Sequence, residues 1–295
     1  MEPTMVSEQV RERAKAGPIP KADYQALFDA LEAERSPRDP EWVQAWIILH
    51  CATRQRAFAC QRLLSRYNRQ CVKRGTMGEY SEFLRHVQDD LGFYLPNGNA
   101  YTENFRGVDV GEIMAQCGEL AARFAELELE VFANSGTLLG IVREGTLLEH
   151  DNDIDLGVLL TARTFEGAAQ EWIALTDKLI ADGVGVSRST WSKVTLKLQK
   201  IGAFGVDLFP AWIDADDKVY VYPHTFGALR RDQLLPYDLH GPTGLHLPAD
   251  AEAMLECNYG EGWRVPNVGW GFDWKTANAQ FEAFLTAVEA AAAPD

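Results

Sequence analysis

The apolar positions in the first third of the chain repeat at helical spacing. Apolar side chains recur three or four residues apart between Tyr24 and Leu31, which favours an amphipathic helix. Pro40 follows Asp39 and is typical of the first turn of a helix, and this helix is expected to run to about residue 69. The polar residues 1–20 end in a Gly-Pro-Ile-Pro segment. We therefore predict a flexible N-terminus at 1–20 and an all-helical region at 21–108.

From residue 109 onward, stretches with an apolar period of two alternate with stretches of helical period. The amphipathic pattern between Ile113 and Leu127 predicts one more helix. The elements expected after it are a short strand at 129–131, a strand at 153–159, a helix at 162–182, a hairpin formed by 194–198 and 206–208, and helices at 248–258 and 275–292. The pattern predicts a second domain at 109–295 of the α+β class, with a small mixed sheet flanked by helices.

Composition narrows the classes of function that the chain can have. The 295 residues carry a formal net charge of -15, which argues against binding to nucleic acid, because such binding depends on Lys and Arg side chains that neutralise phosphates. No apolar run approaches the ~18 residues of a membrane span, and the start lacks the pattern of a secretory signal. The five cysteines include no C-x-x-C pair. A cytoplasmic protein with reduced cysteines and no transmembrane segment is expected.

The charge is unevenly distributed along the chain. Residues 41–80 hold seven Lys or Arg residues against only two acids, Glu41 and Glu79. A solvated helix face is the simplest interpretation of this basic segment. Contact with an anionic acceptor, with a membrane surface at its periphery, or with another subunit are the alternatives, and the sequence leaves them open.

Three aspartates have the spacing of a metal site. On a strand at 153–159, Asp153 and Asp155 project from one face while Ile154 and Leu156 point into the core. Two adjacent carboxylates repel each other, so a half-buried D-x-D favours a hard divalent cation with oxygen ligands. Asp207 has the same setting between two apolar residues and places a third carboxylate beside the pair if the hairpin joins that strand. We predict that all three bind Mg²⁺, with Mn²⁺ as the alternative, and that Asp207 could instead accept a proton.

The segment Ser135-Gly136-Thr137 lies where a predicted strand gives way to a helix. Backbone N–H groups at a helix start attract anions, and a glycine allows close approach, so the segment is predicted to cradle a phosphate of a nucleotide. The basic residues nearest to these elements are predicted to neutralise a pyrophosphate: Arg143, Lys193 and Lys197. Asp151 shares the parity of the D-x-D pair at the very start of the strand and is expected to be a supporting residue.

Taken together, these segments resemble the LicD/fukutin family. The sequence reads SGTLLGIVREG at 135–145, DNDIDLGV at 151–158 and VDLFP at 206–210, and it ends with YGEGWRVP at 259–266 and FDWK at 272–275, which look like the closing motifs of fukutin-like members. The resemblance covers residues ~110–275. Glu149 and His150 depart from it, since many members have Pro and Trp at these positions, so the entrance beside the metal pair is expected to differ.

This resemblance implies a nucleotidyltransferase fold and a specific reaction. Family members move a phospho-alcohol, such as phosphocholine, ribitol phosphate or glycerol phosphate, from a CDP-linked donor to a hydroxyl of a glycan or related acceptor. The resemblance also implies metal ligation by Asp153 and Asp155 and matches Asp207 to the third acid of the family. Two alternatives stay open: a nucleotidyltransferase that loads NMP from an NTP onto a small acceptor, and a non-catalytic scaffold.

Several other residues allow two interpretations. His150 either contacts a substrate phosphate or is a partly exposed histidine at the entry to a strand. Trp263, Arg264 and Trp274 either form a stacking wall for a base or sugar, or hold the Gly- and Pro-rich C-terminal loops in place. The sequence does not decide between these roles.

Overall fold

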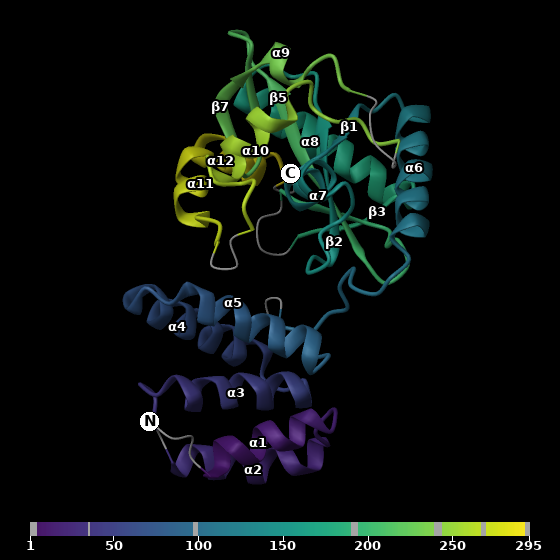
Figure 1. Cartoon of the computed structure of the whole chain (residues 1–295). Helices are drawn as coiled ribbons and strands as arrows, with labels where there is room; N and C mark the ends of the chain where they lie inside the picture. Colours follow the sequence, from purple (N-terminus) through teal and green to yellow (C-terminus); the bar gives the residue numbers. More distant parts are fainter. Residues whose placement is uncertain are drawn as a thin grey trace. The chain divides into compact units, whose positions relative to one another are not determined.

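The computed structural model describes residues 5–34, 36–96, 100–189, 194–238, 244–266 and 270–292. The chain divides into two compact units, residues 1–103 and 104–295 (Figure 1), whereas the boundary expected from the sequence lay between residues 108 and 109. No helix in these ranges combines the length and apolar character that crossing a membrane requires.

The N-terminal unit consists of helices around its own apolar core. Its elements are α1 (Met5–Lys15), α2 (Lys21–Ala33), α3 (Pro40–Thr53), α4 (Ala57–Arg74), α5 (Met77–Arg85) and a π-helical turn at His86–Asp90. Helix α3 is the centre of the unit, because its residues from Ile47 to Thr53 are all buried. The Asp39 side chain caps this helix by accepting the backbone N–H of Glu41 at 3.0 Å, as expected for an N-cap.

Two expectations about this unit were wrong. Residues 5–15 form α1 instead of a flexible terminus, and this helix buries Ser7, Val10 and Ala14. The single helix expected from Pro40 to residue 69 is two helices, because Arg54 and Arg56 adopt left-handed backbone angles of φ 51° and 48°. No glycine or proline lies at this break, so the helical pattern of the sequence continues across it and predicts a single helix.

The C-terminal unit is built on one seven-stranded mixed sheet flanked by helices (Figure 1). The strands are β1 (Val131–Ala133), β2 (Asp153–Leu159), β3 (Gly185–Arg188), β4 (Leu196–Leu198), β5 (Gly205–Ile213), β6 (Lys218–Val221) and β7 (Thr225–Arg230). The helices are α6 (Val110–Glu126), α7 (Ser135–Glu144), α8 (Phe165–Ala181), α9 (Arg231–Leu234), α10 (Ala251–Tyr259), α11 (Trp274–Gln280) and α12 (Glu282–Ala291). The expected mixed sheet with flanking helices and a helical N-terminal region is therefore confirmed.

The strand order places β2 and β5 side by side in the middle of the sheet. The main path is β1-β2-β5-β4-β3, and β6 and β7 extend from the far end of β5. β2 and β5 run parallel, whereas the other pairs are antiparallel. The predicted strand at 153–159 and the predicted pairing of 194–198 with 206–208 are confirmed. The sequence pattern did not predict β3 or the β6–β7 hairpin.

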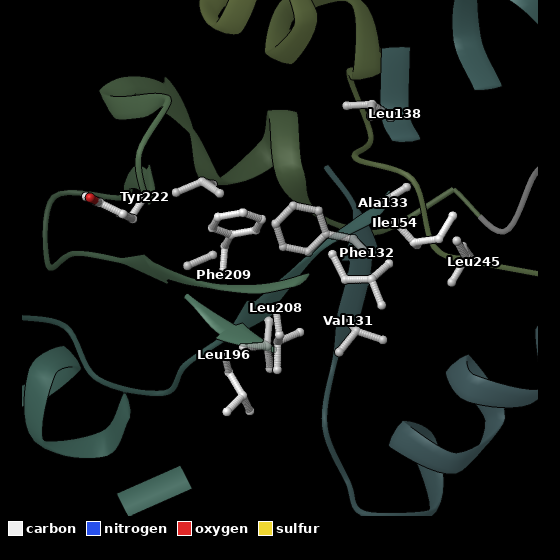
Figure 2. Packing of buried hydrophobic residues seen from close by; sticks show 14 of the residues in the cluster. Val131, Phe132, Ala133, Leu138, Ile154, Leu196, Leu208, Phe209, Tyr222 and Leu245 are labelled. Carbon is white, nitrogen blue, oxygen red and sulfur yellow. The ribbon is translucent and has the colours of Figure 1, made fainter. Parts of the chain in front are cut away.

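Along β2 and β5, one face of the sheet is apolar throughout, whereas the other face changes from polar to apolar along the strands. Ile154 and Leu156 of β2 and their partners Val206 and Leu208 of β5 are fully buried in the core. On the opposite face of β2, the aspartates occupy the beginning of the strand, and Gly157 follows them under the ring of Phe132. A Cβ at position 157 would lie only 2.4 Å from Cζ of this ring. Figure 2 shows part of this packing. The aromatic packing thus limits the polar region to the first residues of the two strands.

Candidate active site

Asp153, Asp155 and Asp207 come together near the beginnings of the neighbouring strands β2 and β5. The parallel register places Asp155 directly opposite Asp207, and Asp153 precedes Asp155 by two residues on the same face. One carboxylate oxygen of each residue lies within 4.8 Å of the others. The structure therefore brings together the three residues that the sequence predicts as metal ligands, on two neighbouring strands.

The first turn of α7 fixes Asp155 in place. The Gly136 N–H donates to Asp155 Oδ2 at 3.1 Å, and the Asp155 N–H donates to Thr137 Oγ1 at 2.8 Å. The backbone N–H of Asn134 donates to the Asp155 carbonyl at 3.0 Å. These bonds tie the carboxylate and its backbone to the same turn, so the side chain has little freedom to move away from the cluster.

Gly136 has a second, steric role beside the carboxylates. A Cβ at this position would lie 2.2 Å from Asp151 Oδ2 and 3.5 Å from Asp155 Oδ2. Only glycine therefore allows the carboxyl group of Asp151 to approach the start of α7 so closely. The phosphate-cradling role of Ser135, Gly136 and Thr137 stays a prediction, and in this structure the N–H of Gly136 is already bonded to Asp155.

Asp207 is buried, with 6% of its surface exposed, and is paired with a lysine on the neighbouring strand. Lys197 on β4 lies opposite Asp207 in the register, and its Nζ is 2.5 Å from Asp207 Oδ2. The other oxygen, Oδ1, is buried and has no hydrogen-bond partner in the described part of the chain. One oxygen of Asp207 is thus neutralised, and the other lacks a donor.

The carboxylates of this cluster are shifted toward their neutral forms. Burial, together with the charge of Asp151, raises the pKa of Asp153 to about 7. Burial and then the charges of Asp153, Asp151 and Asp207 raise the pKa of Asp155 well above its ordinary value. Burial raises the pKa of Asp207 as well, although Lys197 opposes the shift. A single ammonium group does not balance so many acids, which is the condition that a bound cation relieves.

The donor set suits a hard divalent cation. All candidate ligands are carboxylate oxygens, they converge from two strands, and Asp207 Oδ1 has no competing donor in the described residues. Asp151 adds a nearby carboxyl group whose pKa is raised by burial. The chemistry of the residues therefore fits magnesium, and manganese equally by ligand type.

Other predicted site residues have different surroundings. Arg143 donates through Nε to Glu144 Oε1 at 2.7 Å and through Nη1 to the Trp263 carbonyl at 3.1 Å. It therefore holds the loop after α10 against α7, and its role toward a pyrophosphate stays a prediction. The Ser135 hydroxyl is buried and unpartnered within the described ranges, and Ser135 has a strained φ of 46°. Lys193 lies outside the described residues.

The remaining candidate residues, His150, Trp263 and Trp274, differ in the solvent exposure of their side chains. His150 is exposed at the end of the loop before β2. Trp263 is buried at 5% exposure under the guanidinium of Arg264, 4.4 Å from its ring centroid. Trp274, in contrast, is 52% exposed. Trp263 thus has the packing expected of a residue that holds a loop, whereas Trp274 leaves both of its interpretations open.

Tyr259 is a residue near the cluster that the sequence analysis did not single out as a site residue. Burial and then the charges of Asp155 and Asp151 raise its pKa, so the phenol lies within the field of the carboxylates. Its ring lies 4.8 Å from that of Trp270, which is 40% exposed. Tyr259 is the first residue of the closing motif YGEGWRVP at 259–266, and this position is the feature of the sequence that could have indicated a role at the site.

Comparison with known proteins places this site within a recognised domain. Residues 128–245 match the family model described as LicD/FKTN/FKRP, nucleotidyltransferase domain. The matched segment contains the three clustered aspartates, the start of α7 and Lys197. A search of curated proteins found no match to the chain. This match supports membership of the matched segment in the LicD family.

Proposed function

We propose that the C-terminal unit is a magnesium-dependent phosphotransferase with a nucleotidyltransferase fold. It moves a phospho-alcohol, such as phosphocholine, ribitol phosphate or glycerol phosphate, from a CDP-linked donor to a hydroxyl of a glycan or related acceptor. Family membership suggests a transferase that modifies glycans or transfers choline phosphate. The observation that carries the proposal is the convergence of Asp153, Asp155 and Asp207 within 4.8 Å on two parallel strands.

In this proposal the three aspartates hold the cation. Bound Mg²⁺ supplies positive charge that offsets the charge on the donor phosphates and on the leaving nucleotide. Asp155 is suited to a fixed ligand position because Gly136 and Thr137 bond its carboxylate and its backbone. Catalysis of phosphoryl transfer depends mainly on positioning and charge, so a ligand held in this way is more useful than a mobile one.

Asp207 and Lys197 have a different task from the D-x-D pair. Lys197 binds Oδ2 of Asp207 and leaves Oδ1 without a donor in the described part of the unit. In the proposal, Oδ1 either completes the cation site or accepts the proton of the attacking hydroxyl. The ammonium group of Lys197 keeps Asp207 in one orientation and reduces the negative charge of the cluster.

The test is an analysis of products released by the purified full chain. With Mg²⁺, a glycan that offers the acceptor hydroxyl, and separately added CTP, CDP-choline, CDP-ribitol or CDP-glycerol, we expect CMP from one of the CDP-alcohols as its phospho-alcohol joins the acceptor, and no pyrophosphate from CTP. Asp155→Asn should reduce CMP release about 1,000-fold or more, since it removes a charged ligand. Asp182→Asn, which changes an exposed acid at the end of α8, should leave the rate unchanged.

The opposite results identify the alternatives. Release of pyrophosphate from CTP without CMP from the CDP-alcohols would contradict phosphotransfer and support the loading of NMP from an NTP. Unchanged CMP release in Asp153→Asn and Asp155→Asn would show that the cluster is not the catalytic centre. Loss of cellular function on removal of residues 1–100, with none in these two variants, would support the scaffold alternative.

A further inference from the structure

The N-terminal unit contains a groove of its own, separate from the aspartate cluster in sequence and in composition. Two adjoining hollows, with volumes of about 370 and 640 Å³, share Arg56 and Phe58 in their walls. The larger hollow is lined by residues of α2, α3 and α4, all within the N-terminal unit. We call the two hollows together the arginine groove. Their combined size is in the range of sites that hold a small organic molecule.

Positive charge gathers on one side of the arginine groove without matching acids. Arg62, Arg66 and Arg69 line it from α4, and their spacing of four and three residues places them on one helix face. Arg56 lines it from the start of the same helix. In the described part of the chain none of these arginines forms an ion pair, and Glu32 is the acid in the wall of the larger hollow.

These arginines gather on one wall although the chain as a whole has a net charge of -15. An anion bound between guanidinium groups on one helix face accepts paired hydrogen bonds from them and neutralises their charge. Phosphate oxygens match the planar fork of arginine especially well. The charge pattern therefore indicates a ligand that carries a phosphate group.

The other side of the groove is aromatic. Trp46 contacts Phe28 edge-on at 4.7 Å between ring centroids and Trp42 at 5.7 Å, and all three rings line the larger hollow. The guanidinium of Arg56 lies 4.4 Å from the centroid of Phe28, so a planar group already stacks on this wall. Phe58 is 60% exposed where the two hollows meet. A planar aromatic group can extend this stack.

From these two walls we infer that the arginine groove binds a planar aromatic molecule carrying phosphate, the chemical class of the nucleotides. The base contacts the exposed ring of Phe58 and the guanidinium of Arg56, which covers Phe28, and the phosphate contacts the arginines of α4. A concave hollow with aromatic rings in its wall fits a single such molecule better than a flat lipid surface. The inference does not depend on the function proposed for the C-terminal unit.

Calorimetric titration of the full chain tests the inference. The Asp155→Asn protein in EDTA removes metal-dependent nucleotide binding at the aspartate cluster, so that AMP, CMP, GMP and UMP report on the groove. We expect one nucleotide to bind at one site per chain and ribose 5-phosphate to bind about tenfold more weakly, because it lacks the stacking base. Arg66→Gln should weaken nucleotide binding about tenfold.

A matched variant on the same helix provides the control. Lys73 is exposed on α4 and does not line the groove, so Lys73→Gln removes the same charge and should change the affinity by less than about twofold. Phe58→Leu should weaken nucleotide binding and leave ribose 5-phosphate binding unchanged. Equal losses in Arg66→Gln and Lys73→Gln, or equal affinity for nucleotide and ribose 5-phosphate, would overturn the inference. Binding to phosphatidylglycerol vesicles in place of nucleotides would overturn it as well.

Discussion

The two units each gather charges of one sign, but they do so in different physical settings. In the C-terminal unit, short aspartate side chains are fixed by strand register, and Asp155 is bonded to the first turn of α7. In the N-terminal unit, long arginine side chains project from an exposed helix face and can move apart in solvent. The aspartates thus cannot relieve their repulsion by moving, whereas the arginines can.

Because of this difference, the two clusters are not equally strong evidence for a bound ligand. Burial and mutual repulsion raise the pKa values of the aspartates, with Asp153 at about 7, so the unit folds at a cost that a bound cation removes. Exposed arginines cost little when left alone, because water and salt screen them. The acid cluster supports a cation site through its geometry together with the family match, and the arginine groove depends on the aromatic wall beside it.

The comparison predicts that a single methyl group at Gly136, outside the set of metal ligands, has a large effect. In Gly136→Ala, the new Cβ would lie 2.2 Å from Asp151 Oδ2, so either the Asp151 carboxyl group or the first turn of α7, which carries the N–H donor to Asp155, must shift. We expect CMP release from the CDP-alcohol substrate to fall about 100-fold, because a displacement of this kind disturbs a fixed ligand. Steady-state rates of the purified variant, measured with Mg²⁺, provide the test.

Gly78→Ala is the matched control for this substitution. Gly78 lies in α5 of the N-terminal unit, and a Cβ there meets no atom within 4 Å. The control should keep full activity and gain slightly in stability, as glycine in a helix generally does when replaced by alanine. Full activity in Gly136→Ala would mean that the close approach of Asp151 and the bond to Asp155 are not needed for function.

Much of the acid cluster could be predicted because strand periodicity is a local property. The alternation around Ile154 and Leu156 predicted β2 with the bounds that the structure has, and it also predicted which side chains share a face. That β4 pairs with β5 followed from two short alternating runs around a glycine turn. In contrast, the steric role of Gly136 depends on the position of Asp151, fifteen residues later, and no local pattern reveals such a contact.

The parts of the fold that could not be predicted are those decided by tertiary contacts. The break between α3 and α4 falls at Arg54 and Arg56, which adopt left-handed angles without glycine or proline. Helix α1 is mainly polar, and it is stabilised because its few apolar residues pack into the core of the unit. The β6–β7 hairpin has the strand sequences KVYV and TFGALR, in which polar and apolar residues do not alternate regularly, so periodicity does not separate it from a loop.

A thermal-unfolding experiment sharpens the contrast between fixed and mobile charges. In EDTA, Asp153→Asn should raise the unfolding temperature by about 4 °C, because it removes one of several buried like charges. Mg²⁺ should raise the unfolding temperature of the unmodified protein and have little effect on this variant. Arg66→Gln should leave the unfolding temperature within about 1 °C, since its side chain is exposed. A lower unfolding temperature in Asp153→Asn without metal would contradict the view that repulsion destabilises the empty cluster.

The smallest predicted effect concerns two histidines, one in each unit. Burial, and for His50 also the charge of Arg56, lowers the pKa of both His50 and His224 to about 4. In an unfolded chain these side chains have a pKa near 6.5, so below this value the unfolded state binds more protons. The stability that each neutral histidine retains above pH 6.5 is lost as the pH falls toward 4. At pH 6 the loss is about 1 kcal/mol for each histidine.

Hydrogen exchange can assign this loss to each unit separately. Between pH 7 and pH 6, after correction for intrinsic exchange rates, the protection of α3 and of β7 should each fall in the unmodified protein. His50→Gln should abolish the fall in α3 alone and His224→Gln the fall in β7 alone, since His50 is buried in α3 of the N-terminal unit and His224 directly precedes β7 in the C-terminal unit. If one substitution changes the pH dependence of both segments, the two units unfold together, and the groove and the acid cluster then belong to a single cooperative structure.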